Sequence, residues 1–83
     1  MTEIAEIVPV LADLLKPFNF ENKPLVESTD IPAELNIDSV GVLDFIMEVE
    51  DHFDIEIPMN AVANIRTVGE LATYVQSRLN KVG

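Results

Sequence analysis

The sequence predicts an all-α fold, and three observations support this prediction. Apolar residues recur at helical spacing over residues 4–15, 42–53 and 68–79. Residues that cap helices precede two of these segments, Asp38 before the second and Thr67 before the third. Strict alternation between apolar and polar residues, which would indicate strands, is weak throughout the chain.

The first helix is expected from about residue 3 to about residue 15. Its apolar residues are Ile4, Ile7, Val8, Leu11, Leu14 and Leu15. Pro9 lies inside this range and lacks the N–H group of an internal helical hydrogen bond. We therefore expect either a kink at Pro9 or a regular helix that begins nearer to this residue.

A long irregular connection is expected between the first and second helices. Residues that break helices mark it: Pro17, Asn19, Asn22, Pro24, Asp30 and Pro32. A loop of this length in a small domain needs a function or firm anchoring. Apolar side chains should hold it to the core, namely Phe18, Phe20, Leu25, Val26, Ile31 and Leu35.

The second helix should begin at Asp38 and Ser39, with Asp38 as N-cap, and end at about Phe53. Residues 55–57, Ile-Glu-Ile, are the only candidate strand. A short helical segment then fits residues 59–64. The last helix begins with a capping box formed by Thr67 and Glu70. Its apolar face consists of Val68, Leu71, Ala72, Val75 and Leu79.

Length and composition favour a folded, water-soluble protein. The chain has 83 residues, 48% of them hydrophobic, which suits one small domain over residues 1–83. No apolar run approaches the roughly 20 residues of a membrane span. The acidic N-terminus has no signal-peptide pattern. We therefore expect a monomeric, cytoplasmic protein. Because cysteine is absent, any thioester chemistry would need an imported thiol.

The charge is strongly negative and unevenly distributed. Fifteen acidic residues face five basic ones, for a net charge of −10. We therefore do not expect nucleic acids or anionic membranes as partners, because proteins bind both through lysine and arginine side chains. Seven acidic residues lie between positions 38 and 56, while no Lys or Arg lies between Lys23 and Arg66. Such a surface either keeps the protein in solution or attracts basic partners.

The residue pattern of the second helix predicts one buried apolar face and one exposed acidic face. One face is a buried stripe of Val42, Phe45, Ile46, Val49 and Phe53. The opposite face holds Val40, Asp44, Met47 and Asp51, with Glu48 and Asp54 on its flanks. Isolated exposed apolar residues are common, but here two of them stand in one row among carboxylates. This pattern favours a transient docking surface.

Ser39 lies at the N-terminal end of the second helix. The helix dipole and the unpaired backbone N–H groups favour an anion there. A phosphodiester on Ser39 would be well placed. The residues alone favour a simpler interpretation, in which Ser39 is a second capping residue.

Residues 35–40, Leu-Asn-Ile-Asp-Ser-Val, resemble the Leu-Gly-x-Asp-Ser-Leu signature of acyl carrier proteins. The resemblance covers roughly residues 28 to 80. It continues through Asp44, Glu50, Asp51, Phe53, Ile55 to Pro58, Ile65, Thr67, Val68, Leu71, Tyr74 and Val75. An Asp-Ser pair alone is a weak motif, but the pair followed at this spacing by an acidic helix and Ile57-Pro58 is a specific one.

The resemblance implies a small four-helix bundle with a long loop between the first two helices and a short third helix. It implies that a phosphopantetheinyl transferase moves 4'-phosphopantetheine from coenzyme A onto Ser39. The thiol of this arm then holds an acyl group as a thioester, so the protein is a carrier and not an enzyme. Asp38 matches the acidic residue near the magnesium ion of the transferase.

The resemblance also assigns surfaces. The recognition helix, which meets basic patches on synthases, acyltransferases or ligases, matches Val40, Asp44, Met47, Glu48 and Asp51. Acyl chains slide between the helices in this family. The matching lining is Phe45, Ile46, Val62, Ile65, Leu71 and Ala72.

Some positions depart from the family pattern. Val40 replaces Leu, Asn36 replaces Gly, and Gly41 replaces a residue that is commonly acidic. Glycine weakens a helical turn by about 1 kcal/mol relative to alanine, so this end of the helix should be mobile. Residues 59–61, Met-Asn-Ala, replace acidic residues of the third helix. Together with Pro9, these changes indicate a specialised carrier of one lipid or secondary-metabolite pathway.

Other functions fit less well. A Ser-His-Asp hydrolase fails because the only histidine, His52, lies about 20 Å along the same helix from Ser39. An EF-hand is excluded because apolar residues fall at the ligand positions, which leaves weak divalent binding by Asp51, Asp54 and Glu56. An aminoacyl or peptidyl carrier and an acidic adaptor without a prosthetic group remain alternatives.

Overall fold

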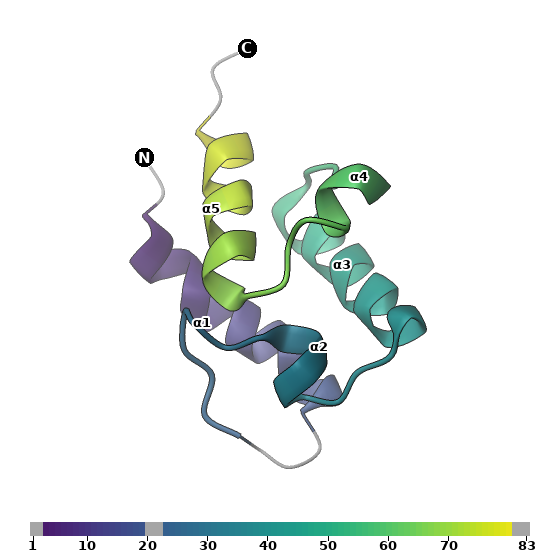
Figure 1. The fold of residues 1–83 in the computed structure, drawn as a ribbon. Helices are drawn as coiled ribbons and strands as arrows, with labels where there is room; N and C mark the ends of the chain where they lie inside the picture. Colours follow the sequence, from purple (N-terminus) through teal and green to yellow (C-terminus); the bar gives the residue numbers. More distant parts are fainter. Residues whose placement is uncertain (1–2, 20–22, 81–83) are drawn as a thin grey trace.

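The computed structural model describes residues 3–19 and 23–80, which fold into helices joined by irregular segments (Figure 1). The elements are α1 Ile4–Leu15, the 3-10 turn η1 Lys16–Phe18, α2 Ile31–Glu34, α3 Ser39–Phe53, α4 Met59–Val62 and α5 Val68–Leu79. The predicted all-α class is confirmed. None of the helices in this part of the chain is long and apolar enough to cross a membrane.

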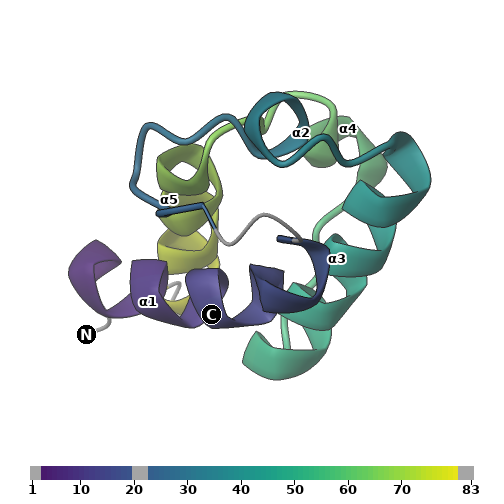
Figure 2. The same ribbon diagram turned by 90° about the horizontal axis from the view of Figure 1, so that it is seen from below.

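Helix α1 packs against both α5 and α3 (Figures 1 and 2). Short α4 lies beside α3 in both views. Apolar side chains from all the longer helices meet in one core. Its fully buried members include Ile7, Leu11, Leu15, Phe45, Val49, Val68, Leu71 and Val75. Helical periodicity assigns all of these residues to the inner faces, whereas Val42 and Phe53 of the predicted buried stripe are only partly buried.

Pro9 lies inside α1, which begins at Ile4. The expectation that the regular helix begins nearer to Pro9 is therefore wrong. Both Pro9 and Ala5 are exposed. The backbone carbonyl of Ala5, which has no N–H partner at Pro9, belongs to the solvent side of the helix, where water can satisfy it.

The connection between α1 and α3 is more ordered than the sequence predicts. It contains η1 and the helical turn α2, which the sequence interpretation missed. Phe18 packs its ring edge-on against Phe45, with ring centroids 6.2 Å apart. Ile31 and Leu35 are buried as expected. Val26 is 55% exposed, so its predicted anchoring role is wrong; Phe20 lies outside the described residues.

Three backbone hydrogen bonds hold this connection beside the start of α5. Gly69 N donates to Glu27 O at 2.8 Å, and Val68 N donates to Thr29 O at 3.0 Å. Ile31 N donates to Arg66 O at 2.8 Å. A Cβ atom on Gly69 would lie 3.0 Å from the Glu27 carbonyl oxygen, so glycine permits this close approach.

The segment after α3 differs from the predicted strand. Asp54 ends α3 in the left-handed conformation, with φ 55°. Residues 55–57 run on without pairing to any strand in the described chain. The backbone N–H of Ile57 donates instead to Glu50 Oε2 at 2.8 Å. A side chain of α3 therefore satisfies this backbone group, and the candidate strand is wrong. Helix α4 also ends at Val62, two residues before its expected end.

Candidate functional site

Ser39 is the first residue of α3, and its side chain is exposed. The N-cap is Asp38, whose Oδ1 accepts a hydrogen bond from Gly41 N at 2.8 Å. Within the described residues the Ser39 hydroxyl makes no hydrogen bond. The interpretation of Ser39 as a second capping residue is therefore wrong. Because Asp38 alone caps the helix, the Ser39 hydroxyl is available for covalent chemistry.

Gly41 is needed for packing in the first turn of α3. A Cβ atom at this position would overlap Cγ2 of Ile37. The absence of a side chain lets the Ile37 methyl group lie against the helix. Asn36, just before it, has φ 52°, a left-handed conformation that asparagine tolerates well. The turn that leads into Ser39 is thus shaped by residues 36, 37 and 41 together.

A groove of about 360 Å³ opens beside Ser39. Its walls come from α2, from the residue before the α3 cap, from the N-terminal half of α3, from α4 and from the segment that follows α4. Most of the lining is aliphatic: Ile37, Val42, Leu43, Met59, Val62 and Ile65. Ser39 and Arg66 provide the polar side chains of the lining. The groove could hold a flexible apolar chain that is tethered at Ser39.

The predicted acyl-chain residues separate into two groups. Val62 and Ile65 line the groove. The other four belong to the closed core and do not line it: Phe45, Ile46, Leu71 and Ala72. Sequence reasoning missed Val42 and Leu43, although they follow Ser39 by three and four positions and so share its side of the helix. It also missed Arg66, which has no local signal connecting it with Ser39.

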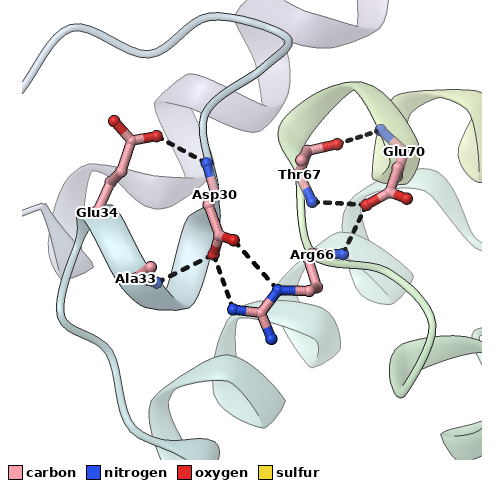
Figure 3. A network of polar contacts seen from close by, with 6 residues as sticks. All are labelled: Asp30, Ala33, Glu34, Arg66, Thr67 and Glu70. Atoms are coloured by element: carbon pink, nitrogen blue, oxygen red, sulfur yellow. Dashed lines mark hydrogen bonds and ion pairs between the residues drawn. The ribbon is translucent and has the colours of Figure 1, made fainter.

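Asp30 holds the side chain of Arg66 (Figure 3), one of the residues that line the groove. Its Nε donates to Asp30 Oδ2 at 3.1 Å, and its Nη2 lies 3.4 Å from Oδ1. Asp30 is also the N-cap of α2, since its Oδ1 accepts from Ala33 N at 3.1 Å. The hydrogen bond from Ala33, together with Arg66, lowers the pKa of Asp30 below its ordinary value.

The backbone of Arg66 belongs to a second cap. Its N–H donates to Glu70 Oε1 at 3.0 Å, as does the N–H of Thr67. Glu70 N donates in turn to Thr67 Oγ1 at 3.0 Å, which confirms the predicted capping box. The hydrogen bonds from Thr67 and Arg66 lower the pKa of Glu70. Arg66 therefore links the caps of α2 and α5 beside the groove.

The outer face of α3 is exposed as the sequence predicts. Val40 is 67% and Met47 62% exposed. The carboxylates of Asp44, Glu48 and Asp51 lie on exposed residues of the same helix. His52 is also exposed, and its ring lies 4.9 Å from that of Phe53. Among residues 3–19 and 23–80, no three His, Cys, Asp or Glu side chains are grouped to hold a metal ion.

Comparison with known proteins gives consistent matches. A family described as "Phosphopantetheine attachment site" matches residues 5–75. The acyl carrier protein of Lactobacillus acidophilus is 33% identical over 73 residues, which cover 87% of this chain and 91% of the relative. The mitochondrial acyl carrier protein of Saccharomyces cerevisiae is 33% identical over 70 residues, or 78% of this chain and 56% of the relative.

The fold is also found in a solved structure. A Toxoplasma-specific mitochondrial acyl carrier protein superimposes with a TM-score of 0.85. The match covers 98% of this chain and 96% of the Toxoplasma chain, at 22% sequence identity. At this identity the likeness concerns the arrangement of the helices.

Proposed function

The chain belongs to the acyl carrier protein family, and we propose that residues 1–83 act as one carrier domain with acyl thioesters on an arm attached to Ser39. The prosthetic group of this family is 4'-phosphopantetheine. It supplies the thiol that a chain without cysteine lacks. The observation that carries the proposal is the exposed Ser39 hydroxyl, left unbonded by the Asp38 cap and placed at the groove.

The residues around Ser39 fit this group. In the reaction of a phosphopantetheinyl transferase, the hydroxyl oxygen would bond to the pantetheine-side phosphorus of coenzyme A and lose its proton, while the P–O bond of the pyrophosphate breaks and adenosine 3',5'-bisphosphate leaves. Asp38 uses Oδ1 for the cap, and its Oδ2 accepts no hydrogen bond within the described residues. We assign that oxygen to the neighbourhood of the magnesium ion of the transferase. The N-terminus of α3 favours the phosphodiester that results.

The groove provides a place for the acyl chain. Its aliphatic lining, which includes Val62 and Ile65, can remove the first part of an apolar chain from water. A longer chain would reach the core side chains of Phe45, Ile46, Leu71 and Ala72 only if α3 and α4 moved apart. In the proposal, the groove is therefore the entrance and the core is the deeper part of the path.

The outer face of α3 is proposed as the docking surface. Val40 and Met47 supply exposed apolar area, and Asp44, Glu48 and Asp51 supply negative charge. Acyl synthases, acyltransferases or ligases with basic patches are the proposed partners. On this view the protein is a carrier and cosubstrate and catalyses no reaction itself. We place it in the cytoplasm, in a lipid or related biosynthetic pathway, as a specialised carrier.

The direct test is the intact mass of the protein after incubation with coenzyme A, Mg²⁺ and a broad-specificity phosphopantetheinyl transferase. The parent protein should gain one phosphopantetheine, and Ser39→Ala should gain none. This variant should stay folded because Asp38, not Ser39, caps α3. No gain on folded parent protein would favour an adaptor without a prosthetic group. A gain on Ser39→Ala would show that another residue carries the arm.

A further inference from the structure

Among the described residues that line the groove beside Ser39, Arg66 is the one with a cationic side chain. In the sequence, the first basic residue before Arg66 is Lys23 and the first after it is Arg78, and the net charge is −10. Arg78 lies elsewhere, with Glu50 and Glu56 around a separate hollow. A cation in an otherwise aliphatic groove is therefore a specific feature of the Ser39 site.

Only some of the N–H groups of the Arg66 guanidinium donate hydrogen bonds. An arginine carries five N–H donors, and two of them, on Nε and Nη2, point to Asp30. No other acceptor contacts the guanidinium within the described residues. The side chain is 61% exposed, whereas that of Asp30 is 33% exposed. Asp30 thus holds the planar group beside the groove while most of its donors stay available for a second anion.

A cation near Ser39 would offset the negative charge that a phosphodiester brings. A phosphodiester on Ser39 would add a negative charge next to the carboxylate of Asp38, in a chain already rich in acid. Like charges this close repel each other. The N-terminus of α3 offsets part of this repulsion. An arginine offsets more, because its forked N–H groups match the oxygens of a phosphate.

Building on the proposed function, we propose that Arg66 binds the phosphodiester of the arm. Its N–H groups that do not contact Asp30 donate to the non-bridging phosphate oxygens. Asp30 acts through Arg66 as a positioning residue, since it keeps the guanidinium at the groove. The near end of the arm is thereby fixed next to the aliphatic wall, and the attached chain enters the groove from a defined side.

The test compares apo and loaded protein by NMR, with loading on Ser39 checked by intact mass. On loading, the Arg66 Nε–H resonance should shift and its exchange with water should slow. In loaded Arg66→Gln, the ³¹P resonance should move away from its position in the folded, loaded parent. It should move toward the position measured for the loaded protein unfolded in urea, where the phosphodiester has no fixed protein contact. Arg66→Lys should give an intermediate ³¹P resonance, because lysine keeps the positive charge but lacks the paired N–H donors of the guanidinium. Arg78→Gln, which removes the same charge elsewhere, should leave the ³¹P resonance in place.

A second variant separates phosphate binding from loosening of the fold. Asp30→Asn breaks the same ion pair but keeps the guanidinium. Its ³¹P resonance should move in the same direction as that of Arg66→Gln but less far, because a guanidinium that the Asp30 carboxylate no longer positions can still reach the phosphate. Equal changes in both variants would overturn the inference, as would an unchanged resonance in loaded Arg66→Gln. If the parent gains no mass, the proposed function fails as well, because there is then no phosphodiester to bind.

Discussion

The Nε–H of Arg66 donates to Oδ2 of Asp30 at 3.1 Å, between residues 36 positions apart in the chain. Asp30 caps α2 through Ala33 N, and the backbone of Arg66 donates to Glu70 in the cap of α5. Two local caps are therefore joined by one tertiary contact (Figure 3). Because this contact lies at the groove beside Ser39, the stability of the caps and the geometry of the site are connected.

Thr67→Ala should lower the free energy of unfolding by about 1 kcal/mol, because it removes the side-chain acceptor of the α5 cap. Urea unfolding followed by circular dichroism measures this loss. The matched control is Thr73→Ala in the same helix. Thr73 Oγ1 donates to the Gly69 carbonyl, a bond that contributes little to a helix. An equal loss in both variants would contradict the importance of the cap.

The Asp30 and Glu70 carboxylates should stabilise the fold less as the pH falls. Their native pKa values lie below their ordinary values of 3.8 and 4.5. The unfolded chain therefore binds more protons, and this contribution to stability increases with pH. It is complete above the ordinary values and is lost as the pH falls through the lower native values. Accordingly, the difference in unfolding free energy between the parent and Asp30→Asn/Glu70→Gln should shrink from about pH 7 to about pH 3.

General charge repulsion also changes with pH, so this comparison needs a control that removes the same charge. Asp44→Asn/Glu48→Gln neutralises two exposed carboxylates on the outer face of α3. Since the chain carries a net charge of −10, this variant should be as stable as the parent or more stable near neutral pH. The expectation for Asp30 and Glu70 is wrong if both double variants show the same loss at neutral pH and the same pH dependence.

Gly41→Ala should destabilise the protein although alanine favours helices. The new Cβ would overlap Cγ2 of Ile37. Overpacking of this kind costs about 1–3 kcal/mol, more than the roughly 1 kcal/mol gained in helix propensity. A double variant with Ile37→Ala should lose less stability than the sum of the two single variants, as urea unfolding can measure. Stabilisation by Gly41→Ala would show that Ile37 moves away freely.

Asp44→Asn/Asp51→Asn should slow association with a basic partner enzyme and flatten the dependence of the rate on salt. Exposed charges steer encounters, and salt screens them. Stopped-flow association rates at several salt concentrations measure the effect. Glu3→Gln/Glu6→Gln, which neutralises two exposed residues at the start of α1, is the control of equal charge. Unchanged association rates in Asp44→Asn/Asp51→Asn would contradict docking on α3.

Much of the fold could be predicted because its signals are local. Periodic apolar residues define α1, α3 and α5, since residues three and four positions apart share one side of a helix. The caps at Asp38 and Thr67 could also be predicted, because each side chain accepts a hydrogen bond from the backbone N–H of the residue three positions later. The position of Ser39 at the start of α3 follows directly from its neighbour Asp38.

Short elements were harder to predict for a physical reason. Helix α2 has four residues, too few for periodicity to appear. Its signals are the Asp30 cap, a proline in the first turn and Glu34, whose Oε2 accepts from Asp30 N at 2.7 Å. The segment 55–57 has a strand-like pattern, but no second strand exists among the described residues to pair with it. Pairing depends on distant residues and not on the segment itself.

The sequence by itself determined α1, α3 and α5, the caps at Asp38 and Thr67, and the place of Ser39 at the start of α3. Only the tertiary structure decided what surrounds that serine. Apolar side chains look alike in a sequence, so only packing separates Val62 and Ile65 in the groove from Phe45 and Leu71 in the core. Arg66 reaches the same groove because the backbone of residues 29–31 bonds to that of residues 66–68, and contacts between distant segments form only when the chain has folded.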